Sequence, residues 1–158
     1  MTQLETGAQA PDFALLNAND EEVALKDFAG KKVILYAYPA ALTPGCTIEA
    51  IDFSAALGVF AQAGYSILGI SPDSPVTLTS FTERNNLAIT LLADPTRETL
   101  TAYGAWGDRE LWGKVLPGVI RSTFVIEVDD TGEGKILSAE YGVRAKGHVQ
   151  RLRDSLGI

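Results

Sequence analysis

Two short apolar segments separated by one long helical segment limit the fold of this chain more than any other feature. Residues 33–38 form a continuous apolar run, and residues 65–70 form a second, largely apolar run. Such runs are typical of strands that are buried on both faces of a sheet. Between them, residues 47–63 carry apolar side chains at close to helical spacing, and Gly64 follows as a helix stop. A strand, a helix and a strand joined by a right-handed crossover predict a parallel pair in an α/β sheet.

The remaining segments extend this pattern to a whole domain. In chain order they predict an N-terminal β-hairpin within 11–28 that turns at 17–20, a helix over 75–86, a strand over 89–93, a short helix over 94–103, a strand over 119–126, a turn at 129–132, an antiparallel strand over 135–141 and an amphipathic helix over 146–156. This order predicts a thioredoxin-like fold, in which helices flank a central mixed β-sheet and the β-hairpin is an N-terminal extension. A flavodoxin-like sheet is the competing architecture, but the C-terminal end lacks a second clear strand–helix–strand repeat. No linker-like stretch divides the chain, so we expect residues 1–158 to form a single domain.

Charge and hydropathy argue against several classes of partner. Lys and Arg number 13 against 20 Asp and Glu, and the resulting formal charge of −7 disfavours nucleic acid and anionic membranes. The longest run free of polar and charged residues, 33–42, is too short to span a membrane and contains Pro39. Residues 1–5 lack the basic and apolar regions of a signal peptide, so we expect a cytoplasmic protein.

Cysteine and histidine each occur once. One cysteine, Cys46, cannot form an internal disulfide or a thiolate metal cage, and one histidine removes most other metal sites, so we expect no metal. His148 lies in the C-terminal helical segment among Lys146, Arg151 and Arg153. We therefore interpret His148 as a structural residue on a solvated helix face.

Cys46 follows the central strand at the start of the long helix. Thr43 is a suitable N-cap, and Pro44 occupies the first helical position, where proline is well tolerated, so Cys46 falls in the first turn. Free backbone N–H groups and the positive end of the helix dipole favour a thiolate there. The ends of strands in open α/β sheets are also common ligand sites. This placement favours a reactive nucleophile over the alternative of a small buried core residue.

The spacing Pro39-x-x-x-Thr43-x-x-Cys46 resembles the active-site motif of the peroxiredoxins. Its setting, Tyr38-Pro39 and then Thr43-Pro44-Gly45-Cys46-Thr47-x-Glu49-Ala50, is similar to the branch called bacterioferritin comigratory protein, or peroxiredoxin Q. Similar segments run nearly from end to end: Gly7-x-x-Ala10-Pro11-Asp12-Phe13, Leu25-x-Asp27-x-x-Gly30-Lys31, Gly69-Ile70-Ser71-x-Asp73, Leu91-Leu92-Ala93-Asp94-Pro95, Tyr103-Gly104-x-Trp106-Gly107 and Arg121-Ser122-Thr123-Phe124-Val125-Ile126.

The resemblance implies a thiol-dependent peroxidase that acts on hydrogen peroxide and small organic hydroperoxides. Cys46 would attack the peroxide as a thiolate and become a sulfenic acid. Thr43 would direct its hydroxyl at the peroxide and the sulfur, and the N–H groups of Gly45 and Cys46 would bind the peroxide oxygens. Pro39 would form a wall of the pocket. Because sulfur itself is oxidised and reduced, no cofactor is implied.

Two charged residues acquire roles from the same resemblance. Arg121 is similar to the family arginine that holds the thiolate and polarises the peroxide; from its neighbours alone, a solvent-facing strand residue is the alternative. Glu49 lies one helical turn after Cys46, so the two can share a face. An unpaired carboxylate there would oppose a thiolate, and the family role of holding the arginine removes that conflict. Without the resemblance, Glu49 would be an ordinary surface charge.

One departure from the family pattern concerns recycling. Many members of the branch carry a second cysteine five residues after the first, where this chain has Ile51. A one-cysteine protein would need an external thiol, such as thioredoxin, a glutaredoxin-like protein or a low-molecular-weight thiol. Two alternatives stay open: a redox sensor or relay that passes oxidation to a partner by a mixed disulfide, and a non-catalytic interaction module with an inert cysteine. The oligomeric state, monomer or homodimer, stays open too.

Overall fold

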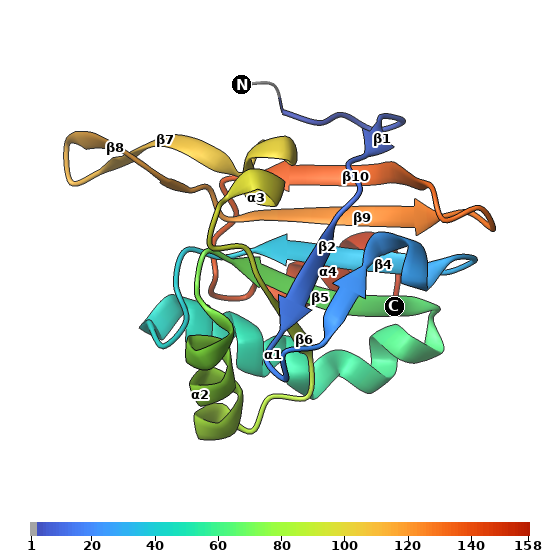
Figure 1. Ribbon diagram of the computed structural model, residues 1–158, viewed down its shortest axis with the longest axis horizontal. Coiled ribbons are helices and arrows are strands. Elements are labelled where there is room, and N and C mark those ends of the chain that lie inside the picture. Colours follow the sequence, from blue (N-terminus) through green and yellow to red (C-terminus); the bar gives the residue numbers. More distant parts are fainter. Residues whose placement is uncertain (1–2) are drawn as a thin grey trace.

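An eight-stranded mixed sheet forms the centre of the computed structural model, which describes residues 3–158 (Figure 1). The order across the sheet is β1-β10-β9-β4-β5-β6-β2-β3. These strands are β1 (Gln9–Ala10), β2 (Ala14–Asn17), β3 (Glu22–Ala24), β4 (Lys32–Ala37), β5 (Tyr65–Ser71), β6 (Thr90–Ala93), β9 (Ser122–Val128) and β10 (Gly134–Tyr141). β4 and β6 both pair with β5 in parallel, whereas the other neighbours are antiparallel. The predicted mixed sheet with an added N-terminal hairpin, β2–β3, is therefore confirmed.

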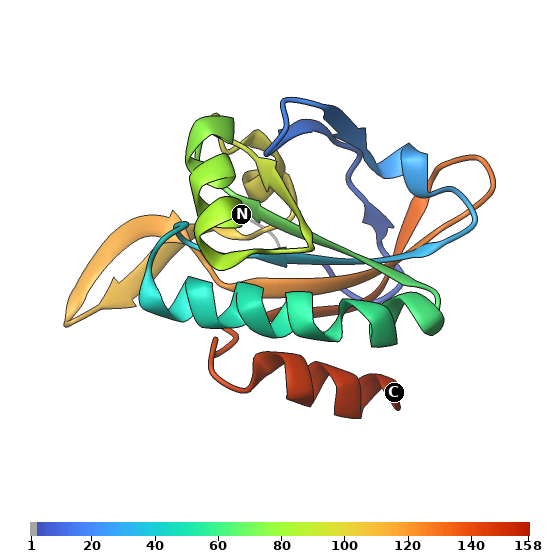
Figure 2. The ribbon, with the colours of Figure 1, turned by 90° about the horizontal axis from the view of Figure 1, so that it is seen from below.

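Helices cover both faces of this sheet. They are α1 (Pro44–Gln62), α2 (Pro75–Asn85), α3 (Glu98–Ala102), α4 (His148–Leu156) and the 3₁₀ helix η1 (Leu25–Phe28). Figure 2 shows α1 and α4 side by side on one face. On β4, Ile34 joins the core cluster that contains Phe53 of α1, and the next residue, Leu35, joins the cluster on the other face with Leu100 of α3. This alternation explains why residues 33–37 of β4 are all apolar. In the described part of the chain, no helix combines the length and apolar character that a membrane span requires.

Backbone conformation sets helix ends that differ from the predicted ones. α4 begins at His148 rather than 146 because Gly147 has a φ of 76°, which no helical residue adopts. α3 is shorter than the predicted 94–103 because Arg97, with a φ of 65°, ends a turn from Asp94 before the helix starts. α2 ends one residue early because Asn86 is left-handed.

A third hairpin was not predicted. It consists of β7 (Trp106–Leu111) and β8 (Lys114–Val119), which pair with each other and project from the main body in Figure 2. The strand predicted over 119–126 therefore begins later, at Ser122. Val119 is the last residue of β8. The N–H of the next residue, Ile120, donates to the carbonyl of Ala105 at 2.7 Å, so the pairing with β7 ends before Arg121. Arg121 consequently lies in the link before β9 rather than inside a strand.

Candidate active site

Cys46 lies in the first turn of α1, beyond the carboxyl end of β4. Thr43 occupies the N-cap with an extended backbone, at φ −95° and ψ 153°, and Pro44 is the first helical residue, as predicted. The Cys46 residue is only 2% exposed and joins the core cluster on the α1 face. The sulfur is thus shielded from bulk water while it remains at the positive end of a 19-residue helix.

The Thr43 side chain does not cap the helix. Its hydroxyl donates instead to the carbonyl oxygen of Ala40 at 2.7 Å. Within residues 3–158, the backbone N–H groups of Gly45 and Cys46 consequently have no hydrogen-bond partner. Two donors therefore stay available beside the sulfur, and the Thr43 oxygen can still accept a hydrogen bond.

The loop that leads from β4 into α1 is held by the neighbouring strand. Pro39 is half-buried at the start of this loop, and Leu42 has a φ of 65°, an uncommon conformation for a residue with a side chain. The Asp73 carboxylate, just after β5, accepts the N–H of Ala41 and the hydroxyl of Ser71, both at 2.7 Å. Sequence reasoning gave Asp73 no role of its own. Its contacts fix the backbone conformation that carries Thr43.

Arg121 faces Cys46 rather than solvent. Its Nη2 donates to the Cys46 Sγ at 3.3 Å, and its Nη1 donates to Oε1 of Glu49 at 2.5 Å. The Arg121 side chain is 16% exposed and that of Glu49 is fully buried. Burial by itself would lower the pKa of Arg121, but Glu49 and Cys46 outweigh it and the pKa is raised. The guanidinium is therefore a permanent cation at the sulfur.

Glu49 and Gly45 both adapt α1 to this arginine. The alternative of a surface charge for Glu49, which applied only without the family resemblance, is wrong, because its side chain is inaccessible and paired. Gly45 packs against the guanidinium: a Cβ there would lie 3.6 Å from Arg121 Nη2 and 3.6 Å from the Cβ of Ala145. A longer side chain at this position would compete with the guanidinium for space.

The placement of His148 on a solvated face is also wrong. His148 is 2% exposed, and its Nδ1 lies 2.8 Å from the second oxygen, Oε2, of Glu49. Its Nε2 lies 2.9 Å from Oγ1 of Thr123 on β9. The buried residues of α4 are His148, Val149 and Leu152, which share one helical face that packs on α1. Of the cations nearby in sequence, Lys146 and Arg151 are exposed, whereas Arg153 is half-buried.

Residues 6–136 match the profile of the AhpC/TSA family. The chain belongs to this family. A peroxiredoxin homologue from Mycobacterium tuberculosis is 49% identical over 99% of this chain and 98% of its own length. Peroxiredoxin Bcp of Escherichia coli is 39% identical over 82% of this chain and 83% of its own length.

A solved structure extends the likeness to three dimensions. The bacterioferritin comigratory protein of Xanthomonas campestris superimposes with a TM-score of 0.82 at 30% sequence identity, covering 92% of this chain and 90% of that one. Together these relatives identify the chain as a peroxiredoxin of the Bcp/peroxiredoxin Q branch and as a thiol-dependent peroxidase enzyme. Within that branch it has a single cysteine.

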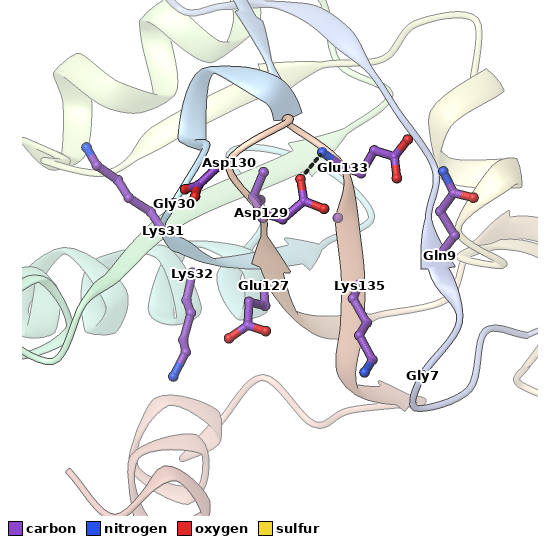
Figure 3. Close-up of a pocket in the computed structure, with 12 residues that line it drawn as sticks. Gly7, Gln9, Gly30, Lys31, Lys32, Glu127, Asp129, Asp130, Glu133 and Lys135 are labelled. Atoms are coloured by element: carbon purple, nitrogen blue, oxygen red, sulfur yellow. Dashed lines mark hydrogen bonds between the residues drawn. The ribbon is translucent and has the colours of Figure 1, made fainter.

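The peroxiredoxin also has a surface hollow of about 640 Å³ at the other end of β4, around Lys32 (Figure 3). Lysine and carboxylate side chains both line it. The Asp129 carboxylate points back into its own turn, where it accepts the N–H groups of Thr131 at 2.9 Å and Glu133 at 3.0 Å. This carboxylate closes the β9–β10 hairpin, and the hollow contains none of the residues around Cys46.

Proposed function

We propose that this peroxidase reduces hydrogen peroxide and small organic hydroperoxides through a sulfenic acid at Cys46, with an external thiol as reductant. The observation that carries the proposal is the Arg121 guanidinium, which donates to the Cys46 sulfur at 3.3 Å while it is anchored on buried Glu49. A charge-assisted hydrogen bond of this kind stabilises a thiolate, the nucleophilic form of cysteine. An inert core cysteine would need no such cation.

The first step is a two-electron transfer from sulfur to oxygen. The thiolate attacks one oxygen of the peroxide, an S–O bond forms and the O–O bond breaks. The O–O electron pair leaves with the other oxygen, which takes up a proton, so that the thiolate, ROOH and one proton become Cys–SOH and ROH. Negative charge moves from sulfur to the leaving oxygen during this step. Donors placed along that path lower the barrier.

Four residues supply the groups that this step requires. Arg121 and the free N–H groups of Gly45 and Cys46 are donors to the peroxide oxygens. Because the Thr43 hydroxyl already donates its hydrogen to Ala40, its oxygen is the acceptor for the O–H of the peroxide. This assignment directs Thr43 at the substrate rather than at the sulfur.

The remaining predicted residues support the reacting groups. Glu49 holds the guanidinium through Nη1. Pro39, half-buried in the loop after β4, forms a wall of the substrate pocket and, as a proline, offers no competing N–H donor. The Xanthomonas campestris structure is described in terms of alkyl peroxide reduction, which supports organic hydroperoxides as substrates here.

Recycling requires two thiols from outside the chain, because position 51 is isoleucine and Cys46 is the single cysteine. The first thiol, R′SH, condenses with Cys–SOH to a mixed disulfide and water. The second attacks that disulfide, releases R′SSR′ and restores the Cys46 thiol. Thioredoxin, a glutaredoxin-like protein and a low-molecular-weight thiol all have the chemistry to serve.

The test is single-turnover oxidation followed by quenched-flow mass spectrometry. Reduced wild-type protein mixed with hydrogen peroxide or a small alkyl hydroperoxide should gain one oxygen on Cys46, react with a sulfenic-acid reagent and return to the thiol when a reductant is added. Cys46→Ser is the matched control and should leave the peroxide unconsumed. Peroxide consumption by Cys46→Ser at the wild-type rate would refute the assignment of the nucleophile.

The same assay distinguishes the redox-relay alternative. A peroxidase should turn over repeatedly with at least one of the three classes of thiol reductant. An oxidised protein that resists all of them but forms a mixed disulfide rapidly with one partner protein would favour the relay.

A further inference from the structure

A continuous line of hydrogen bonds connects the Cys46 sulfur to α4. It runs from Cys46 to Arg121 at 3.3 Å, from Arg121 to Glu49 at 2.5 Å, from Glu49 to His148 at 2.8 Å and from His148 to Thr123 at 2.9 Å. The first two contacts belong to the proposed mechanism. The last two involve a buried, titratable side chain that the mechanism does not use.

The direction of the His148 contact with Glu49 follows from chemistry. A carboxylate that is ion-paired with arginine accepts hydrogen bonds and cannot donate them, so Nδ1 of His148 carries the hydrogen. Glu49 is fully buried, and each of its two oxygens has one of these partners. Removal of the Nδ1 donor would leave Oε2 unsatisfied in the core, which is costly for a charged group.

The imidazole ring is itself held on two further sides. Thr123 of β9 contacts Nε2, and the ring of Phe53 packs against the imidazole at 5.5 Å with an interplanar angle of 87°. His148 therefore has little freedom to rotate, and it fixes the plane of the Glu49 carboxylate. That plane determines where the guanidinium of Arg121 lies, because the carboxylate binds it through a single oxygen.

We propose that His148 is a positioning residue for peroxide reduction: through Glu49 it keeps the Arg121 guanidinium directed at the Cys46 sulfur and at the bound peroxide. This role rests on the proposed function. It assigns α4 a part in the reaction, although in the described structure hydrogen bonds connect α4 to Arg121 and Cys46 only through Glu49. Loss of the Nδ1 donor should slow the peroxide step more than it slows other reactions of the thiolate.

The experiment compares two substitutions of nearly equal shape. His148→Asn retains an N–H at the place of Nδ1, whereas His148→Leu has the same branching and no donor. For each variant, two rate constants are measured on Cys46: oxidation by hydrogen peroxide and alkylation by iodoacetamide. Alkylation needs a thiolate but no donor directed at a peroxide. Leu152→Ala is the control for stability, because Leu152 is buried on the same face of α4 and lies outside the network.

We expect His148→Leu to lower the rate constant for peroxide about tenfold, the effect of one lost hydrogen bond to a charged group, and to lower alkylation less. His148→Asn should recover most of the peroxide rate, and Leu152→Ala should retain it despite a lower stability. A wild-type rate in His148→Leu would overturn the proposal. So would equal losses in His148→Leu, His148→Asn and Leu152→Ala, since these would follow stability alone.

Two further outcomes are informative. If His148→Leu fails to fold, Thr123→Val tests the same network by removing the contact to Nε2 of His148. The imidazole should then be held less firmly, and the rate constant for peroxide should fall a few-fold. An unchanged value would overturn the proposal. If wild-type protein does not oxidise with peroxide, the proposed function fails. Fast wild-type oxidation together with an unaffected His148→Leu variant refutes only the role of His148.

Discussion

Substitution of Arg121 by alanine should change activity and stability through two different atoms. Nη2 contacts the Cys46 sulfur at 3.3 Å, so its loss acts on the reaction. Nη1 contacts Glu49 at 2.5 Å, so its loss strands a carboxylate that is fully buried. The two effects are separable. A second substitution, Glu49→Gln, removes the stranded charge but does not restore a hydrogen-bond donor to the Cys46 sulfur.

The effect on activity follows from the loss of a charged donor at the place where charge develops. Removal of one donor of the oxyanion-hole type costs about 10²–10³-fold in rate. The N–H groups of Gly45 and Cys46 remain, and neither has a partner among the described residues, so they retain part of the stabilisation. We therefore expect the rate constant for peroxide to fall about 100-fold in Arg121→Ala.

The effect on stability follows from the burial of Glu49. Breaking a buried ion pair by removing one partner costs about 3–5 kcal/mol. His148 still donates to Oε2 at 2.8 Å, so we expect the lower end, about 3 kcal/mol, which is a large share of the 5–15 kcal/mol typical of a domain. The double variant Arg121→Ala/Glu49→Gln contains no stranded charge, and its amide oxygen can still accept from His148. It should regain most of the lost stability.

Urea unfolding and single-turnover oxidation measure the two effects on the same proteins. We expect the double variant to unfold near the wild-type midpoint while its peroxide rate stays at the level of Arg121→Ala. Recovery of the rate together with the stability would show that Arg121 acts only by holding the fold together. An unchanged midpoint in Arg121→Ala would contradict the assignment of Glu49 as a buried charge that depends on this partner.

Three further predictions concern other parts of the molecule. Thr43→Val should lower the rate constant for peroxide about tenfold and leave the rate of iodoacetamide alkylation unchanged, whereas Thr43→Ser should retain both rates. An equal loss of the peroxide rate in the two variants would show that the hydroxyl is not the group responsible. Ile51→Cys should form an internal disulfide with Cys46 only slowly, because five residues of helix span about 7.5 Å along the axis and α1 must first unwind; rapid formation, seen by mass spectrometry, would mean that the first turns of α1 open freely. Burial raises the pKa of Asp94, against hydrogen bonds from Leu100 and Thr99. The unfolded chain binds fewer protons than the folded one between the ordinary value of 3.8 and the raised value, so the wild-type free energy of unfolding should fall, relative to Asp94→Asn, as pH rises through this window. If urea titrations gave a difference in the free energy of unfolding between wild type and Asp94→Asn that stayed constant across this pH window, the prediction would be refuted.

Local pattern was sufficient for the centre of the fold and insufficient at its edge. Strands β4 and β5 are buried on both faces, so their sequences are largely apolar, and both strands were predicted to within a residue at either end. In the β7–β8 hairpin, residues 114–117 are exposed and include Pro117, so neither alternation nor an apolar run marks β8. Proline is compatible with a strand that has a neighbour on one side only. This hairpin became visible only in three dimensions.

The residues of the active site also differ in whether local sequence pattern predicts their positions. Cys46 was placed from sequence because helix-start rules act over a few neighbouring residues: Thr43, Pro44 and Gly45 define the first turn. Arg121 is 75 residues away from Cys46 along the chain, and no periodicity connects them. Only the resemblance to a known family suggested that pairing. The sheet places Arg121 beside Cys46 because β9 is the antiparallel neighbour of β4.

His148 shows why neighbouring charges are a poor guide to burial at a helix start. Lys146 precedes Gly147, whose left-handed backbone separates it from the helix. Arg151 folds back on the loop, where it donates to the carbonyl of Lys146 at 2.8 Å and to that of Arg144 at 2.7 Å. Its charge therefore caps the loop before α4 and says nothing about the face on which His148 lies. The helical phase decides instead, because His148 shares its face with Leu152, and that face places the imidazole against Glu49.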